Sequence, residues 1–251
     1  MNNKTQWESL IKEYLALNNS ISAYQFCKEK NLDNSKFYRT AKLLNLEIRQ
    51  RVYQIDKSLV LDPVEKAKLE GHLLGDGSVF YVDSRKKLPA FAIVSKHKSY
   101  LEWIVKESKW ANERPIWIRN QYDSRTTKTY KAYWLRSLSS QFLKEQRERW
   151  YPEGIKLVPK DLILTKDSLV RWYMDDGCFY NQALFLSTDG FTKSDIEYLA
   201  VLLELHNFNP TLTKNGNGYR ISFTRKQSRE FLEYIGPCPT ECFSYKWERK
   251  G

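Results

Sequence analysis

Two nonapeptides decide the fold of this chain: LEGHLLGDG at residues 69–77 and LVRWYMDDG at residues 169–177. Each is an apolar run of helical length, and each ends in an Asp-Gly pair. A glycine directly after such a run typically ends a helix in a left-handed turn. We therefore expect two helices that end at Asp76 and Asp176, and hence two copies of one structural unit.

The segments that follow the two nonapeptides repeat one pattern. After the first, apolar alternation and turn residues predict two strands, a helix, two strands and a helix, at residues 78–82, 88–96, 98–111, 114–122, 128–138 and 140–150. After the second, the same order is predicted at residues 178–180, 183–188, 192–206, 209–214, 218–225 and 226–235. The predicted fold class is therefore α+β, with pseudo-symmetric αββαββα halves at residues 63–160 and 161–251.

The predicted strands each have an apolar face and a polar face. In the run 218–225, aromatic and aliphatic residues alternate with Arg220, Ser222 and Thr224. Because successive strand residues point to opposite faces, one face of such a sheet packs under helices and the other is basic and polar. A sheet of this kind suits the groove of DNA.

Residues 1–55 precede the repeat and predict a small helical domain. Three helices are expected at residues 5–17, 22–31 and 34–46, with N-caps at Ser20, Ser22 and Asn34. The second and third have the shape of a helix-turn-helix, which points Lys36 and Arg39 outward for DNA binding. A plain three-helix packing module explains the same pattern. Residues 47–62 lack a clear apolar face and are interpreted as a linker.

The charge of the chain indicates a polyanionic partner. The 251 residues carry a formal net charge of +11, with a pI near 9.3. Nucleic acid is the first candidate and an acidic membrane surface the second. No apolar run approaches the roughly 20 residues of a membrane-spanning helix, and the N-terminal residues have no signal-peptide pattern. We therefore expect an intracellular protein, in the cytoplasm, nucleoid or an organelle matrix.

Asp76 and Asp176 stand where a carboxylate is disfavoured, at the negative pole of a helix dipole. Gly71 and Gly75, four residues apart on the first helix, indicate close packing against a second helix. If the two predicted helices pack side by side, their carboxylates meet and repel unless they share a proton or a metal. Beside a basic DNA-binding surface, a divalent metal between protein and phosphate resolves this repulsion.

The two nonapeptides, their spacing and the repeated αββαββα order resemble the LAGLIDADG homing endonucleases in their single-chain, two-motif form. The resemblance covers about residues 63–250. It implies a monomer whose paired motif helices form the interface between the halves, with one four-stranded sheet per half in the major groove of double-stranded DNA. It also implies Mg²⁺ or Mn²⁺ at Asp76 and Asp176, with Gly75 and Asp175 as further metal contacts. The implied activity is site-specific double-strand cleavage that leaves short 3′ overhangs.

The same family has a basic residue late in each half, near the metals. Lys156 and Lys246 match that position, and the resemblance implies that they polarise the attacking water or stabilise charge on phosphate. The second motif departs from the family at Arg171, where a small or apolar residue is usual. We expect Arg171 to pair with Asp175 one turn further along the helix. His72 is expected to pack at the helix surface.

Side chains on the polar strand faces are candidates for DNA recognition. The candidates for contact with base edges are Arg119, Gln121, Arg136, Lys214 and Arg220. The candidates for phosphate contact are Arg85, Lys86 and Lys87.

Two other functions remain open. YMDD at residues 173–176 matches the catalytic turn of reverse transcriptases, but that enzyme needs a palm domain and a longer chain. The stronger alternative is a catalytically inactive protein of this fold, either a DNA-binding regulator or an RNA-splicing maturase. The presence of both aspartates and both lysines favours the endonuclease, because a pure binder has no need of an unfavourable carboxylate pair.

Overall fold

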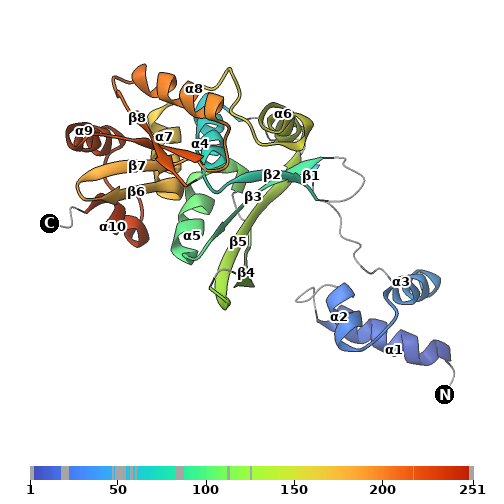
Figure 1. Cartoon of the computed structure of the whole chain (residues 1–251). Helices are drawn as coiled ribbons and strands as arrows, with labels where there is room; N and C mark the ends of the chain where they lie inside the picture. Colours follow the sequence, from blue (N-terminus) through green and yellow to red (C-terminus); the bar gives the residue numbers. More distant parts are fainter. Residues whose placement is uncertain are drawn as a thin grey trace. The chain divides into compact units, whose positions relative to one another are not determined.

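The computed structural model describes residues 3–17, 23–46, 48, 55–56, 59, 61–82, 88–111, 114–124, 126–216 and 218–248. The chain consists of two compact units, Met1–Tyr53 and Gln54–Gly251 (Figure 1). Among the described residues, no helix combines the length and apolarity needed to cross a bilayer.

The larger unit contains the predicted αββαββα order twice. The first copy consists of α4 (Pro63–Leu74), β2 (Ser78–Tyr81), β3 (Pro89–Ser95), α5 (Lys98–Glu107), β4 (Ile116–Asp123), β5 (Lys128–Ser140) and α6 (Gln141–Trp150). The second consists of α7 (Lys166–Asp176), β6 (Gly177–Tyr180), β7 (Ala183–Ser187), α8 (Lys193–Glu204), β8 (Thr211–Asn215), β9 (Gly218–Ser222) and α9 (Arg225–Ile235). The 3₁₀ turns at Lys109–Ala111, Pro152–Gly154 and Glu241–Phe243 and the short helix α10 (Ser244–Trp247) complete the described elements of this unit after β1. The predicted fold class is confirmed.

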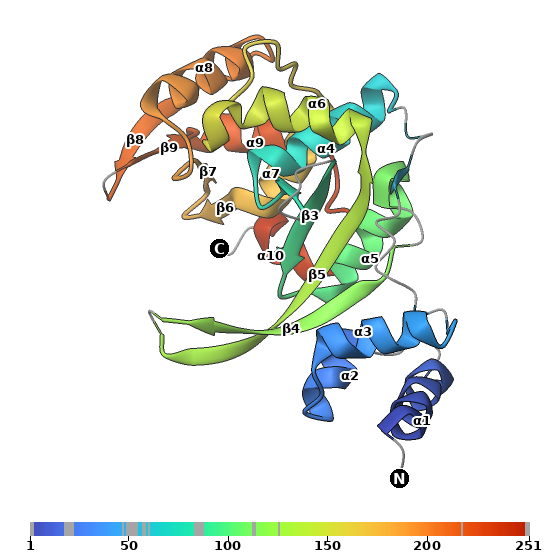
Figure 2. The same ribbon diagram turned by 90° about the vertical axis from the view of Figure 1, so that its right-hand side faces the viewer.

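Each half has an antiparallel sheet with the same strand order. In the first half β3 and β5 are central, with β2 beside β3 and β4 beside β5. In the second half β7 and β9 are central, with β6 and β8 at the edges. The first sheet also has a short parallel strand, β1 (Ile55–Asp56), which pairs with the end of β5. This strand corrects our interpretation of 47–62 as a linker. The β4–β5 hairpin projects from the rest of the larger unit (Figures 1 and 2).

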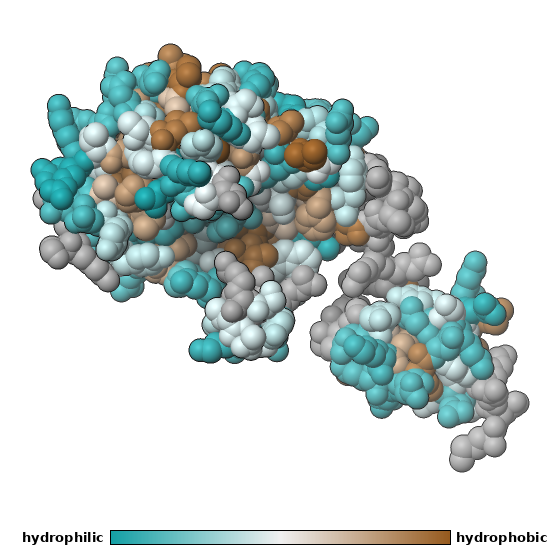
Figure 3. Space-filling view, viewed as in Figure 1, coloured by the Kyte–Doolittle hydropathy of each residue, from teal (hydrophilic) through white to brown (hydrophobic). Residues whose placement is uncertain are grey.

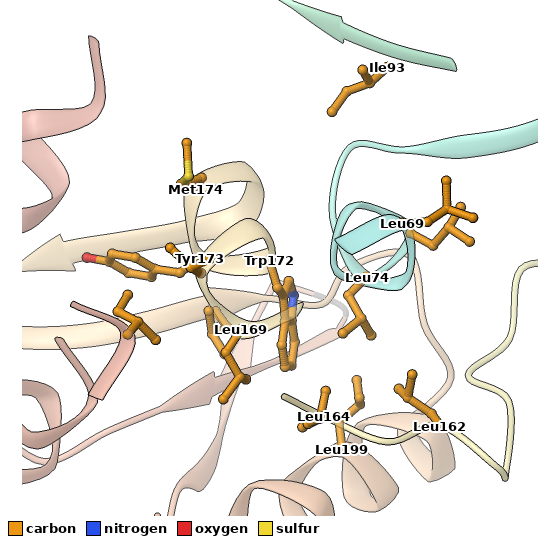
Figure 4. Close-up of a cluster of buried hydrophobic side chains, with 14 of the residues drawn as sticks. Leu69, Leu74, Ile93, Leu162, Leu164, Leu169, Trp172, Tyr173, Met174 and Leu199 are labelled. Atoms are coloured by element: carbon orange, nitrogen blue, oxygen red, sulfur yellow. The ribbon is translucent and has the colours of Figure 1, made fainter. Parts of the chain in front are cut away.

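The two halves share one hydrophobic core, which is centred on α4 and α7 (Figure 4). Leu69 and Leu74 of α4 and Leu169 and Trp172 of α7 are completely buried. Burial of a side chain as large as Trp172 contributes about 3–5 kcal/mol relative to alanine. The paired helices therefore fix the relative position of the two halves as well as the interior of each.

The smaller unit has a separate core. The three predicted helices are present as α1 (Asn3–Ala16), α2 (Ala23–Glu29) and α3 (Asn34–Leu43), and Phe26 and Phe37 lie at their centre. The N-cap of α3 is Asp33 rather than Asn34, because the Asp33 carboxylate accepts the Lys36 backbone N–H at 2.6 Å. Hydrophilic residues cover much of the face of this unit in Figure 3. The other two predicted caps, Ser20 and Ser22, lie outside the described residues.

Candidate active site

Helices α4 and α7 pack with their backbones in close approach, as Gly71 and Gly75 predict. A Cβ atom at Gly71 would lie 2.5 Å from the carbonyl oxygen of Ser168. A Cβ atom at Gly75 would overlap the Cβ of Asp175 and lie 2.9 Å from its Oδ2. Both glycines are therefore required by the space between the helices.

The predicted left-handed turn at the end of each motif is wrong. Among the described glycines only Gly154, Gly216 and Gly236 have a positive φ, so Gly77 is not left-handed, and Gly177 has φ −77°. A Cβ at Gly77 would lie 2.6 Å from the carbonyl oxygen of His72, and one at Gly177 would overlap the Tyr173 ring. Glycine ends each motif because the chain passes close to its own helix, not because φ is positive.

Asp76 and Asp176 belong to one electrostatic cluster at the end of the helix pair. Burial raises the pKa of Asp176 to about 7, and the negative charges of Asp76 and Asp175 add to the shift. Partial burial of its carboxylate, with the charge of Asp175, raises the pKa of Asp76 to about 6, although the residue still faces solvent. Both carboxylates therefore hold their negative charge at a cost that a nearby cation would relieve.

A pseudo-symmetric pair of lysines lies at the ends of the two motif helices. The ammonium of Lys156 donates to the carbonyl oxygens of Gly75 at 3.1 Å and Gly77 at 3.2 Å. The ammonium of Lys246 donates to the carbonyl oxygens of Met174 at 2.6 Å and Asp175 at 3.2 Å. Since Gly75 and Asp175 occupy equivalent places in the two nonapeptides, each lysine neutralises the negative pole of its own motif helix.

Burial lowers the pKa of both lysines, and the neighbouring aspartates oppose that shift. For Lys156 the opposing charges are those of Asp176, Asp175 and Asp76, and for Lys246 the same three residues act. The four residues predicted to be catalytic, Asp76, Asp176, Lys156 and Lys246, are thus brought together.

The oxygen ligands of this cluster fit a hard divalent cation. Carboxylates are the ligands that Mg²⁺ and Mn²⁺ prefer. Among the described residues, no group of three or more His, Cys, Asp and Glu side chains is arranged to hold a metal. A cation at Asp76 and Asp176 would therefore complete its coordination with water and phosphate oxygens, which is usual for Mg²⁺.

Asp175 differs from Asp76 and Asp176 because its side chain is 0% exposed. Its Oδ1 accepts a hydrogen bond from the Tyr100 hydroxyl, and its Oδ2 lies 3.1 Å from Nδ1 of His72. Burial raises the pKa of Asp175 to about 7. The predicted metal contact at this residue thus faces the protein interior. The other predicted contact, Gly75, presents its carbonyl oxygen to Lys156.

Two expectations about the neighbours of Asp175 are wrong. The His72 side chain on α4 is completely buried rather than packed at the helix surface. This burial lowers the pKa of His72 well below its usual value. Arg171 donates to Asp167, one turn earlier, at 3.2 Å instead of pairing with Asp175, and its guanidinium lies over the Trp103 ring. Tyr100 was not predicted at all, since nothing in α5 alone marks it.

Two of the predicted base-reading arginines lie on the polar sheet faces and stack on aromatic rings. Arg136 lies 5.5 Å from the centre of the Trp117 ring and 5.8 Å from that of Trp134. Its neighbour Leu135 is completely buried beneath the helices, so Arg136 lies on the opposite face of the sheet. Arg220 lies 4.0 Å from the centre of the Phe185 ring in the second sheet.

Lys214 does not lie on the same face of the sheet as Arg220. It pairs in register with Tyr219, whereas Arg220 pairs with Thr213, so the two basic residues lie on opposite faces of the sheet. The strand positions of Arg119 and Gln121 pair with Ala132 and Tyr130, but their side chains lie outside the part of the chain that is described. All three predicted phosphate contacts lie outside the described residues: Arg85, Lys86 and Lys87.

In the smaller unit, Lys36 and Arg39 are both exposed on α3. The ammonium of Lys36 lies over the Trp7 ring, 5.3 Å from its centre. The outward placement that the helix-turn-helix pattern predicts is therefore present.

Two αββαββα halves that meet along a glycine-packed helix pair define the class of protein with a LAGLIDADG fold. A family model for the LAGLIDADG DNA endonuclease family matches residues 67–231. The chain belongs to this family.

Similar proteins include an uncharacterized protein of Methanocaldococcus jannaschii, 28% identical over 176 residues that cover 67% of each chain. A probable intron-encoded endonuclease 1 of Wickerhamomyces canadensis is 26% identical over 74% of this chain and 84% of its own. The cytochrome b mRNA maturase bI2 of Saccharomyces cerevisiae is 37% identical over 85 residues, which are 33% of this chain and 18% of the maturase. Among solved structures, the homing endonuclease I-WcaI bound to its DNA recognition sequence has the same fold, with a TM-score of 0.69 at 23% identity, over 82% of this chain and 96% of that one.

Proposed function

We propose that this protein is a metal-dependent endonuclease that cuts double-stranded DNA at a specific site. The observation that carries the proposal is the convergence of Asp76 and Asp176 from equivalent places in the two halves, each beside a helix-capping lysine. The family membership and the similarity to a probable intron-encoded endonuclease support it. The pseudo-symmetric halves lie in one chain, so we expect a monomer to cut both strands.

Asp76 and Asp176 would hold Mg²⁺ or Mn²⁺. Such a cation supplies an activated water and neutralises charge that develops on the scissile phosphate. Lys156 and Lys246 would stabilise the remaining negative charge, because each ammonium is held in the field of all three aspartates. We expect the products to carry short 3′ overhangs.

The polar faces of the two sheets would read the DNA. Arg136 and Arg220 are the best candidates for bidentate contacts with guanine, because their guanidinium groups are already oriented by ring stacking. At equivalent register positions the halves present different side chains: Phe185 of β7 pairs with Ser222, while Ala92 of β3 pairs with Arg136. The preferred site would accordingly differ in its two halves.

We also propose that α3 of the smaller unit adds a DNA contact beside the cleavage site. Residues 1–53 contain nine lysines and arginines against five acidic residues. Lys36 and Arg39 are exposed at the N-terminal part of α3, the part that enters the groove in helix-turn-helix proteins.

The test is a selection of cleaved sequences from a random library of double-stranded DNA. The selected site is then offered to purified protein with Mg²⁺, with Mn²⁺ and with EDTA. We expect cleavage at one sequence in either metal and none in EDTA. Tight binding to a selected sequence without cleavage in either metal would contradict the proposal.

A catalytically inactive binder is the second candidate, and the similarity to the maturase bI2 favours an RNA-splicing role in that case. The same protein preparation separates the two functions. A maturase would bind a structured intron RNA more tightly than the selected DNA, whereas an endonuclease would bind the DNA more tightly.

A further inference from the structure

One position breaks the symmetry of the helix pair. Where α4 has Gly75, α7 has Asp175, and the space in front of Gly75 is filled by the Asp175 side chain. A second side chain at Gly75 would overlap it, so the helix crossing has room for one such group only. The carboxylate of Asp175 thus extends from the second half into the first.

Every hydrogen-bond partner recorded for the Asp175 carboxylate belongs to the first half. Oδ1 accepts from the Tyr100 hydroxyl of α5. Oδ2 lies 3.1 Å from Nδ1 of His72 on α4. The same carboxylate packs against Gly75, the residue before Asp76: a Cβ at Gly75 would lie 2.9 Å from its Oδ2. With no side-chain exposure, this carboxylate cannot reach a phosphate or a water-filled site.

We propose that Asp175 is a positioning residue, not a metal ligand, and that it fixes Asp76 relative to Asp176 by contacting Tyr100, His72 and Gly75 of the first half across the interface. Asp175, Tyr100 and His72 form a cross-half clamp. The inference rests on the endonuclease function, since it concerns the geometry of the two proposed metal-binding carboxylates.

The clamp has a direct geometric consequence. Asp175 immediately precedes Asp176 in the last turn of α7, and its side chain packs against Gly75, which immediately precedes Asp76. The positions of Asp76 and Asp176 are therefore linked through the contact between Asp175 and Gly75. A metal site of two carboxylates depends on such control, because displacement by about 1 Å lowers a reaction rate by about 100-fold.

Tyr100 and His72 hold the clamp in place. His72 is completely buried, and its Nδ1 also lies 3.3 Å from the Tyr100 hydroxyl. The two groups face Asp175 from α4 and α5. In the described part of the chain, Lys156 and Lys246 donate to backbone carbonyl oxygens, and Arg171 donates to Asp167. Loss of either partner would leave the buried carboxylate with one fewer donor.

Three variants distinguish a clamp from a metal ligand: Asp175→Asn, Tyr100→Phe and Asp176→Asn. Mn²⁺ binding to the protein–DNA complex is measured by electron paramagnetic resonance, DNA affinity in Ca²⁺, and cleavage in single-turnover reactions at saturating protein. Asp175→Asn should keep the Mn²⁺ stoichiometry and affinity of the wild type and lose about 10- to 100-fold in cleavage rate. Asp176→Asn should lose Mn²⁺. Loss of Mn²⁺ from Asp175→Asn to the same degree would overturn the proposal.

A double-mutant cycle tests whether Tyr100 acts through Asp175. Residues that share one interaction show non-additive effects. The Tyr100→Phe/Asp175→Asn variant should lose less cleavage rate than the product of the two single losses. Tyr198→Phe, which removes an exposed hydroxyl that donates to the Lys160 carbonyl oxygen and has no bond to the clamp, is the matched control and should combine with Asp175→Asn multiplicatively. Multiplicative losses for Tyr100→Phe would contradict the clamp.

The failure of the clamp and the failure of the endonuclease function have different signatures. A wild-type protein that cleaves no DNA contradicts the proposed function, and the clamp is then tested by the Mn²⁺ titrations and by the same cycle in free energies of unfolding. A wild-type protein that cleaves, with an Asp175→Asn variant that cleaves at the wild-type rate, contradicts the clamp alone.

Discussion

Lys246 donates a hydrogen bond of 3.2 Å to the carbonyl oxygen of Asp175, the residue immediately before Asp176. The equivalent bond in the first half joins Lys156 to Gly75 at 3.1 Å. Each lysine thus lies at the end of the helix whose carboxylate is proposed to bind metal, and the pair repeats the pseudo-symmetry of the fold.

Replacing either lysine should slow cleavage much more than it weakens binding. Lys156→Met and Lys246→Met keep most of the side-chain volume but remove a buried cation from the cluster. We expect each variant to lose about 100- to 1,000-fold in single-turnover cleavage, as for the loss of one charge-stabilising donor. Lys226→Met, on the exposed side of α9, is the control. A cleavage rate within twofold of wild type for Lys246→Met would argue against its role.

The close contacts of the glycines in the helix pair predict that a larger side chain at Gly75 lowers the stability of the protein. Gly75→Ala would force its Cβ into Asp175, and overpacking of this kind costs about 1–3 kcal/mol in the free energy of unfolding. Gly190→Ala is the matched control, because a Cβ at Gly190 meets nothing within 4 Å. Urea titrations of both variants measure the difference. Equal stability of the two would contradict the close packing of α4 and α7.

The raised pKa values of the aspartates predict a pH-dependent stability of the metal-free protein. The pKa values of about 7 for Asp175 and Asp176 and about 6 for Asp76 lie above those of the unfolded chain, so the folded state binds more protons. Stability should therefore fall as pH rises from 6.5 to 8. Below about 6.5, protonation of unfolded His72 opposes this trend, because burial lowers its folded pKa.

Thermal unfolding in EDTA between pH 6.5 and 8 measures this effect. We expect the midpoint to fall in the wild type and to change less in an Asp76→Asn/Asp176→Asn variant. Excess Mg²⁺ should restore the wild-type midpoint at pH 8, since the cation favours the ionised carboxylates. A midpoint that rises with pH in EDTA and falls in the double variant would contradict the assignment of these shifts.

The stacked arginines predict a separable loss of sequence specificity. Arg220→Ala should cost about 1–3 kcal/mol in binding and relax the base preference at one or two adjacent positions. Lys214→Ala, on the opposite face of the same strand pair, should leave the base preference unchanged. Selection of binding sites with each variant gives the comparison, and a base preference altered by Lys214→Ala alone would reverse the assignment of the faces.

The smaller unit should contribute to affinity and not to chemistry. Its core is separate from that of the larger unit, so deletion of residues 1–53 leaves the paired helices intact. We expect weaker DNA binding with a shallower dependence on salt concentration, because fewer phosphates are neutralised, and an unchanged cleavage rate at saturating protein. Lys36→Ala/Arg39→Ala should reproduce part of the loss, and Lys12→Ala on α1 should not. Loss of the cleavage step with binding intact would contradict this role.

Much of the fold follows from the sequence, because the repeat and the strand alternation are local signals. The nonapeptides at 69–77 and 169–177 place the two motif helices, and Gly71 and Gly75 predict the close crossing of those helices. The reason for the terminal glycines is not local. Gly177 is required by the Tyr173 ring behind it, which only the folded backbone shows.

The candidate site was predictable only in its symmetric parts. Asp76, Asp176, Lys156 and Lys246 each have a counterpart in the other half; the repeat identified the two aspartates, and the resemblance to the family identified the two lysines. His72 and Tyr100 have no counterpart that acts in the same way, and they meet Asp175 only through the packing of α4, α5 and α7. The face of Lys214 depends on the register of the hairpin that joins β8 to β9, which alternation in β9 alone does not fix.

The central claim is that Asp76 and Asp176 jointly hold the metal that drives cleavage. The most direct measurement compares linearisation of a plasmid carrying the selected site by wild-type protein and by Asp76→Asn and Asp176→Asn, with Glu197→Gln on the exposed side of α8 as the control. We predict Mg²⁺-dependent linearisation by the wild type and the control, and none by either aspartate variant although both still bind the DNA. Linearisation by Asp176→Asn at the wild-type rate would contradict the account.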